Sequence, residues 1–185
     1  MTPEGTPAVR RAGPGDVVAL ASLARDTFVA TFGHLYTPED RTAFLEKSQT
    51  VAAYTPLLAD PRIGVWVAED SQGALVGFLT AGPCKLPVPA LEPGAGEIRQ
   101  LYLRSTAQGG GLGTRMLVTG LEWLAAQGHA PLYVGVWSGN FGAQRLYGRF
   151  GFEKIGEYDF PVGEHLDREF ILRRRTPPPP APAGS

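Results

Sequence analysis

Residues 96–116 read GEIRQLYLRSTAQGGGLGTRM, and this stretch decides the fold. Its aliphatic first part predicts a strand over residues 96–103, and the pattern after the glycines predicts a helix over residues 111–127. Glycine loses more backbone freedom on folding than any other residue, so three in a row at a strand-to-helix junction need a reason. Two reasons fit: a tight turn, or an anion that sits on the N-terminus of the helix.

Two well-known phosphate-binding patterns fail on this loop. A P-loop requires Lys and then Ser or Thr after its last glycine, but the chain continues as Gly113-Thr114-Arg115. A dinucleotide fingerprint requires glycine or alanine where the chain has Thr114 or Met116. The remaining pattern, Q/R-x-x-G-x-G/A, is matched by residues 108–113. Backbone amides there could form a nest for a pyrophosphate, and a turn that needs glycine only for its geometry is an equal alternative.

Composition narrows the class of protein. The 185 residues are 43% hydrophobic, enough for one domain with a substantial core. The net charge of −1 gives no sign of a nucleic-acid partner. A single cysteine and three histidines offer neither a disulfide nor a metal site. There is no signal-peptide core, and no window approaches the ~18 apolar residues of a membrane span, so we expect a soluble cytoplasmic protein without a membrane partner.

Hydrophobic periodicity and turn residues predict the order β-α-α-β-β-β-α-β-α-β-β, an α/β fold whose sheet has about seven strands. The proline-rich end cannot form a core, so we predict one domain over residues 1–175 and a disordered tail over residues 176–185. Residues 82–95 are predicted to form a long loop. Strands are predicted at residues 8–11, 65–69, 74–81, 96–103, 131–137, 153–160 and 165–173, and helices at 15–31, from Thr37-Pro38 onward, at 111–127 and at 140–149.

A second motif follows the glycine loop. Residues 140–152 match N-x-x-A-x-x-L-Y-x-x-x-G-F, with Asn140 first and Tyr147 inside the motif. With both motifs in this order, residues 8–173 resemble the GCN5-related N-acetyltransferase (GNAT) superfamily. The resemblance implies the GNAT fold, with a mixed central sheet flanked by helices. It also implies transfer of an acetyl group from acetyl-CoA to an amine.

The chemistry requires a proton acceptor and a proton donor. An amine attacks only when neutral, yet ammonium groups have pKa values near ~10, so a base is needed. The resemblance assigns this role to Glu97, directly or through water, and strand alternation puts it on one face with Arg99, Leu101 and Leu103. An ion-paired strand glutamate is the alternative. The resemblance makes Tyr147 the general acid for the departing thiolate, and an aromatic packed on the sheet is the alternative.

The resemblance also implies the contacts of acetyl-CoA. The backbone N–H of Leu101 would stabilise the oxyanion, and the main chain of Leu103 would bind the pantetheine arm. Asn140 would bind the pantetheine or cap the following helix. The family usually has a basic residue where this chain has Gly110, and Arg115 is expected to compensate. The pyrophosphate site would comprise Gln108, Gly109, Gly110, Gly111, Leu112, Gly113 and Thr114.

The sequence identifies the amine acceptor less closely than it identifies acetyl-CoA. Residues 27–32 with 37–40, 44–46 and 134–137 resemble the bacterial spermidine/spermine acetyltransferases, so a polyamine is the favoured small-molecule amine. A peptide or ribosomal-protein N-acetyltransferase and a non-catalytic acyl-CoA sensor are the alternatives. A homodimer is compatible with the resemblance, although no stretch identifies an interface. The carboxylates expected near a polyamine are Asp26, Glu39, Glu97, Glu157 and Asp159.

Overall fold

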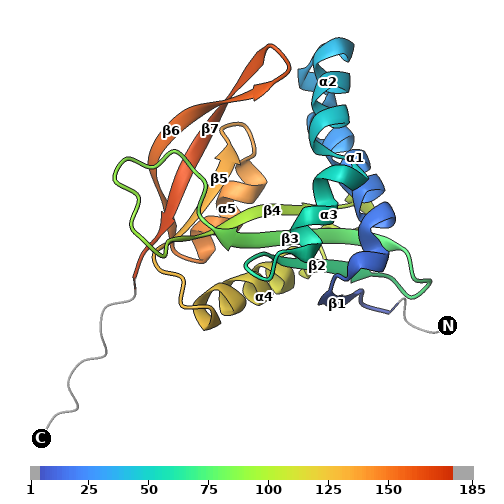
Figure 1. The fold of residues 1–185 in the computed structure, drawn as a ribbon, viewed down its shortest axis with the longest axis horizontal. Helices are drawn as coiled ribbons and strands as arrows, with labels where there is room; N and C mark the ends of the chain where they lie inside the picture. The colour runs from blue at the N-terminus through green and yellow to red at the C-terminus, as the bar shows by residue number, and fades with distance from the viewer. Residues whose placement is uncertain (1–4, 177–185) are drawn as a thin grey trace, which may run out of the picture.

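The computed structural model describes residues 5–176, and its centre is a mixed seven-stranded sheet (Figure 1). The strand order is β1-β2-β3-β4-β5-β7-β6, and all neighbours are antiparallel except β4 and β5. This sheet confirms the predicted fold class. Of the predicted tail, residues 177–185 lie outside the described residues. The strands are β1 (Ala8–Arg11), β2 (Gly64–Glu69), β3 (Leu75–Pro83), β4 (Gly96–Leu103), β5 (Leu132–Trp137), β6 (Phe152–Val162) and β7 (His165–Arg174).

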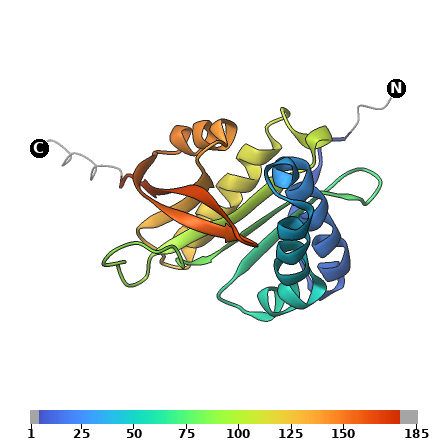
Figure 2. The ribbon, with the colours of Figure 1, turned by 90° about the horizontal axis from the view of Figure 1, so that it is seen from above.

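Helices cover both faces of the sheet, as Figure 2 shows. Helix α4 (Leu112–Ala126) and helix α5 (Phe141–Arg149) pack on one face, and Met116 and Leu117 of α4 are completely buried there. Helix α1 (Val17–Phe32) and helix α3 (Val51–Ala59) cover the other face over β2 and β3. Helix α2 (Pro38–Ser48) continues from α1 and contacts β6.

The start of α2 follows the predicted signal. Thr37 accepts a hydrogen bond from the backbone N–H of Asp40, and Pro38 occupies the first turn, where its missing N–H costs nothing. Helix α3 was not predicted. It contains Pro56 in its interior and has no regular polar stripe, so its sequence does not show the usual helical pattern. Thr50 caps it by accepting from the N–H of Ala53.

Strands β4 and β5 separate along their length, and this separation positions the site. They pair only where residues 96–98 meet residues 132–134. Beyond Ile98 the two strands diverge, as Figure 1 shows, so the rest of β4 lacks a neighbour on the β5 side. A parallel sheet that opens in this way leaves backbone N–H and C=O groups facing the gap.

A bulge in β4 overturns one prediction. Gln100 pairs with Thr80 and Ile98 with Ala81, so Arg99 has no partner in β3. Because of this extra residue, Leu101 and Leu103 pack on the α4 face together with Ile98. Glu97, the neighbour of Ile98, points to the opposite face. The predicted shared face of Glu97 with Leu101 and Leu103 is therefore wrong.

Residues 5–176 contain neither a membrane-spanning helix nor a cluster of metal-binding side chains. None of the helices there is long and apolar enough to cross a membrane. Over the same residues, no three His, Cys, Asp or Glu side chains gather closely enough to hold a metal ion.

Candidate active site

A cavity of about 840 Å³ lies in the gap between β4 and β5 and extends to α1 and the β6–β7 hairpin. We divide its walls into two halves. The glycine half comprises Leu101, Leu103, Gln108, Gly109, Gly111, Gly113, Thr114, Asn140, Ala143, Leu146, Tyr147 and Arg149. The aromatic half comprises Phe28, Thr31, Phe32, Tyr36, Phe44, Glu97, Arg99, Gln100, Tyr102, Trp137, Tyr158, Phe160, Asp167 and Glu169.

The backbone of β4 faces the glycine half. The N–H of Arg104 donates to the carbonyl of Val76 at 2.8 Å, which points Arg104 toward β3. Backbone groups alternate in direction along a strand, so the N–H and C=O of Leu101 and Leu103 point away from β3 and into the gap. Consistent with this, the side-chain amide of Gln108 donates to the carbonyl of Leu103 at 3.3 Å. Leu101 and Leu103 therefore contribute main-chain groups to the pocket.

The glycine loop forms the entrance to α4. Gly109 and Gly111 have φ values of +84° and +79°, a left-handed conformation that strains other residues. A Cβ atom on Gly109, Gly110 or Gly111 would meet no atom within 4 Å, so the loop faces open space. The first N–H groups of a helix have no partner within it, and here they point toward that space. A left-handed residue before a free helix N-terminus fits a bound anion, which favours the nest interpretation.

The positively charged residue that lines the cavity is not the one predicted for the glycine loop. Arg115 donates to the carbonyl of Pro7 at 2.7 Å and does not line the cavity, so its expected compensating role is wrong. Arg149, at the end of α5, lines the cavity instead. Gly110 does not line the cavity either. Leu112 is also absent from its wall because its side chain is buried in the core under α4.

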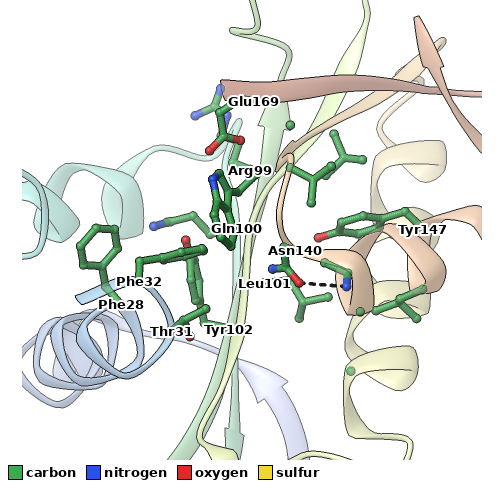
Figure 3. A pocket seen from close by; sticks show the side chains of 18 of the residues that line it. Phe28, Thr31, Phe32, Arg99, Gln100, Leu101, Tyr102, Asn140, Tyr147 and Glu169 are labelled. Atoms are coloured by element: carbon green, nitrogen blue, oxygen red, sulfur yellow. Dashed lines mark hydrogen bonds between the residues drawn. The ribbon is translucent and has the colours of Figure 1, made fainter. Parts of the chain in front are cut away.

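Tyr147 and Asn140 enter the cavity from α5 and its start. Tyr147 is 5% exposed and packs edge-on against Phe152, while Figure 3 shows its hydroxyl pointing into the pocket. Burial, and then the charge of Glu169, raise the pKa of Tyr147, so the hydroxyl is protonated at neutral pH and can donate. Asn140 caps α5 by accepting from the N–H of Ala143 at 3.1 Å, the dashed line of Figure 3.

Glu97 lies on the cavity wall but is already engaged. It is 7% exposed, and its carboxylate accepts a hydrogen bond from the backbone N–H of Lys85 at 2.8 Å. Burial raises the pKa of Glu97, while the bond from Lys85 and the charge of Arg99 act in the opposite direction. The Nε of Arg99 is buried and has no partner among residues 5–176.

Of the five carboxylates expected near the acceptor, only Glu97 lines the cavity. Asp26 pairs with Arg104 at 3.1 Å and Glu157 pairs with Lys154 at 3.0 Å, both at the surface. Glu39 and Asp159 are also absent from the cavity wall. For these four carboxylates the expectation is wrong, because a residue's place in a cleft depends on the path of distant strands and helices.

Besides Glu97, two carboxylates of the aromatic half come from β7, and these two were missed. Asp167 is 5% exposed and accepts a hydrogen bond from the hydroxyl of Tyr36, and His165 Nε2 lies 3.2 Å from its other oxygen. Burial, and then the charge of Asp167, raise the pKa of Glu169 to about 7. One signal was available: Asp167, Glu169 and Ile171 alternate along one strand, so two acids share a face with a core residue.

Aromatic rings line the same half of the cavity as these carboxylates. Phe28 stacks on Phe44 at 4.5 Å between ring centroids, and Phe32 meets the rings of Tyr102 and Trp137 edge-on at 6.2 and 5.9 Å. Figure 3 shows Phe28, Phe32 and Tyr102 on one side of the pocket, with Tyr147 on the opposite side. Aromatic faces next to carboxylates form a site suited to a cation.

The cavity as a whole has the glycine loop and the N-terminus of α4 at one end, and aromatic rings with carboxylates at the other. Residues 18–152 match the family model described as the acetyltransferase (GNAT) family, and the chain belongs to that family. It is therefore an N-acetyltransferase, an enzyme that takes the acetyl group from acetyl-CoA.

Similar proteins agree with this assignment. An uncharacterized N-acetyltransferase from Lactobacillus delbrueckii subsp. lactis is 28% identical over 163 residues, covering 86% of this chain and 91% of that protein. One from Mycobacterium tuberculosis is 27% identical over 161 residues, covering 86% and 97%. The crystal structure of the PaiA N-acetyltransferase from Thermoplasma acidophilum in complex with coenzyme A has a TM-score of 0.73 at 16% identity, covering 93% of this chain and 100% of that chain, and shows the shared fold.

Proposed function

We propose that the chain acetylates a primary amine of a small molecule, with a polyamine favoured, by direct attack of the amine on the thioester in a ternary complex. The observation that carries this proposal is the meeting of two groups in one pocket. The hydroxyl of Tyr147 points into the gap in which the backbone of Leu101 has no strand partner.

The glycine half is suited to acetyl-CoA. The left-handed Gly109 and Gly111 and the open space in front of them support a pyrophosphate on the N-terminus of α4, with Gly113 and Thr114 in its first turn. The exposed main chain of Leu103 is suited to the amide groups of the pantetheine arm, in the manner of an added strand. Asn140 contributes by fixing the start of α5, and its role as a direct ligand is part of the proposal.

The chemical step uses two groups of the chain. The N–H of Leu101 stabilises the negative charge that develops on the thioester oxygen, because it is pre-aligned in a gap without a competing partner. Tyr147 donates its proton to the sulfur as the C–S bond breaks. Its raised pKa keeps that proton in place until the thiolate forms.

The aromatic half supports a cationic acceptor. Three carboxylates, those of Glu97, Asp167 and Glu169, and one guanidinium, that of Arg99, line this half. A polyamine carries several positive charges separated by methylene groups, so both the carboxylates and the aromatic faces can contact it. The polyamine preference rests on this balance of charge.

The test is thiol release from acetyl-CoA with spermidine, propylamine and a short peptide with a free N-terminus as separate acceptors. Release that is fastest with spermidine supports the full proposal. Release with the peptide alone contradicts the small-molecule acceptor. A protein that binds acetyl-CoA in calorimetry and releases no thiol with any acceptor contradicts the catalytic proposal and favours the acyl-CoA sensor.

A further inference from the structure

We propose that Glu169 of β7, rather than Glu97 of β4, accepts the proton of the acceptor ammonium. The inference rests on the proposed function and names the base of that same site. It is carried by the position of the Glu169 carboxylate, which lines the cavity and has no hydrogen-bond or ion-pair partner among residues 5–176.

Strand pairing places Glu169 between two residues that line the cavity. In β7 it pairs with Trp137 on one side and with Tyr158 on the other, and both neighbours line the same cavity. Figure 3 shows its carboxylate entering the pocket at the top of the view, above Arg99 and Gln100. An amine bound in this cavity would therefore have the Glu169 carboxylate on one wall.

Four tyrosines from separate elements surround the same cavity as Glu169. Burial raises the pKa of each, and the charge of Glu169 adds to the increase: they are Tyr36 before α2, Tyr102 of β4, Tyr147 of α5 and Tyr158 of β6. Each must lie close enough to experience that charge. Tyr147, the proposed acid, is among them, so base and acid face one reacting centre.

Glu97 is less suited than Glu169 to accept the proton of the ammonium. Its carboxylate already accepts the N–H of Lys85, and the nearby charge of Arg99 favours its ionised form. Both interactions weaken a base, because they stabilise the carboxylate against protonation. Within residues 5–176, the carboxylate of Glu169 accepts no hydrogen bond and forms no ion pair.

The surroundings of Glu169 allow its carboxylate to take up a proton near neutral pH. Burial acts first, and the carboxylate of Asp167 on the same strand acts second, which raises the pKa of Glu169 to about 7. Asp167 itself accepts a hydrogen bond from the hydroxyl of Tyr36, and His165 Nε2 lies 3.2 Å from its other oxygen. A base is most effective when its pKa lies near the working pH.

The proton balance is as follows. The carboxylate of Glu169 takes one proton from the ammonium, and the freed nitrogen lone pair forms the C–N bond. The C–S bond then breaks, its electron pair goes to sulfur, and Tyr147 protonates that sulfur. A second proton from the nitrogen returns to the Tyr147 oxygen, and Glu169 releases its proton to solvent. The sum is one amide, one thiol and one proton.

The test compares Glu169→Gln with Glu97→Gln and with Glu157→Gln, a matched change outside the cavity. With spermidine as acceptor, Glu169→Gln should lower kcat/KM by about 100-fold, the size expected for loss of a general base. The wild-type profile of kcat/KM should fall below about pH 7, and Glu169→Gln should lack this fall. Calorimetry should give all four proteins the same affinity for acetyl-CoA. Glu157→Gln should match the wild type.

Three results would overturn the inference. The first is a Glu169→Gln enzyme within threefold of the wild type, with the acid limb intact. The second is a loss of that limb in Glu97→Gln alone, which would assign the base to Glu97. The third is a Glu169→Gln enzyme with a raised KM for the amine but unchanged kcat and pH profile, which would make Glu169 only a binding group. Failure of the proposed function is distinct, because the wild type itself would then release no thiol.

Discussion

The two halves of the cavity are built in different ways. The glycine half is built from residues 101–114 and 140–149, two short runs of the chain, and its key groups are backbone N–H and C=O groups. The aromatic half is assembled from α1, α2, β4, β5, β6 and β7, and side chains from these elements form its wall.

This difference explains what each half can recognise. Backbone groups are the same in every residue, so a site that uses them depends on strand geometry and on glycine, and it can serve one fixed ligand. A site made of side chains from six elements changes whenever one of those side chains changes. We infer that the glycine half fixes the donor and that the aromatic half fixes the acceptor.

The largest expected effect concerns the hydroxyl of Tyr147, the proposed general acid. Tyr147→Phe removes only the hydroxyl, so turnover should fall by about 100-fold or more, as for loss of a general acid. The affinity for acetyl-CoA should stay within about twofold, because the glycine nest is untouched. Steady-state kinetics of thiol release and calorimetry measure the two quantities.

Tyr133→Phe is the matched control for that variant. Tyr133 is equally buried, but its hydroxyl donates to Glu92 in the loop between β3 and β4, and Tyr133 does not line the cavity. Turnover in this control should equal that of the wild type. A Tyr147→Phe enzyme with the same turnover as Tyr133→Phe would remove Tyr147 from the acid role.

The second effect concerns the free energy of unfolding and how the buried carboxylate of Glu169 makes it depend on pH. Burial raises the pKa of Glu169 from the ordinary 4.5 to about 7, so the folded chain holds more protons than the unfolded chain between these values. The free energy of unfolding should therefore fall as pH rises through this window, by up to about 3 kcal/mol from this one group. Glu169→Gln lacks the titration, so it should gain stability relative to the wild type between pH 4 and pH 8.

Urea unfolding of both proteins at pH 4 and pH 8 measures this difference. The comparison is between the two proteins at each pH, because the other carboxylates titrate equally in both. A stability difference that stays constant with pH would contradict the raised pKa of Glu169, and it would also weaken the assignment of Glu169 as the base.

Sequence alone predicted the glycine half well, for a physical reason. A strand, a glycine loop and a helix start are local structures, so residues 96–116 carry the information that forms them. The predicted strand over 96–103 has the observed limits, and the predicted helix over 111–127 corresponds to α4 at Leu112–Ala126. The roles assigned to Gly109, Gly111 and Gly113 remain predictions.

The aromatic half was mostly missed, because its formation depends on long-range packing. The bulge at Arg99 turns Glu97 away from the face of Leu101, and no residue type marks that bulge. The burial of Glu169 depends on how β7 lies between β5 and β6, and β5 is separated from β7 in sequence by α5 and β6. A carboxylate's neighbours determine its pKa, so its chemistry was not readable before the fold.

The third effect tests the glycine half alone. Gly111→Asp places a negative charge where the pyrophosphate is proposed to bind, and Gly111→Asn places a neutral side chain of the same shape there. Both residues must adopt the left-handed φ of +79°, so their strain is similar. The dissociation constant for acetyl-CoA should rise by about 30-fold more in Gly111→Asp than in Gly111→Asn, equivalent to about 2 kcal/mol of charge repulsion.

Calorimetry with acetyl-CoA measures both constants, and thermal unfolding checks that the two variants are equally folded. Equal affinity in the two variants would show that no anion lies at the start of α4. The glycines would then be explained by the turn alone, which is the other interpretation of GGG.

The smallest effect tests the aromatic half alone. Phe32→Leu removes a ring that meets Tyr102 and Trp137 edge-on, so a cationic acceptor loses one aromatic contact. The KM for spermidine should rise by about threefold to tenfold, the size of one such contact, and the affinity for acetyl-CoA should not change. Phe141→Leu is the control, because Phe141 is 65% exposed and does not line the cavity. If Phe32→Leu instead weakened acetyl-CoA binding and left the KM of the amine unchanged, the α1 wall would belong to the donor site, and the division into a donor half and an acceptor half would be wrong.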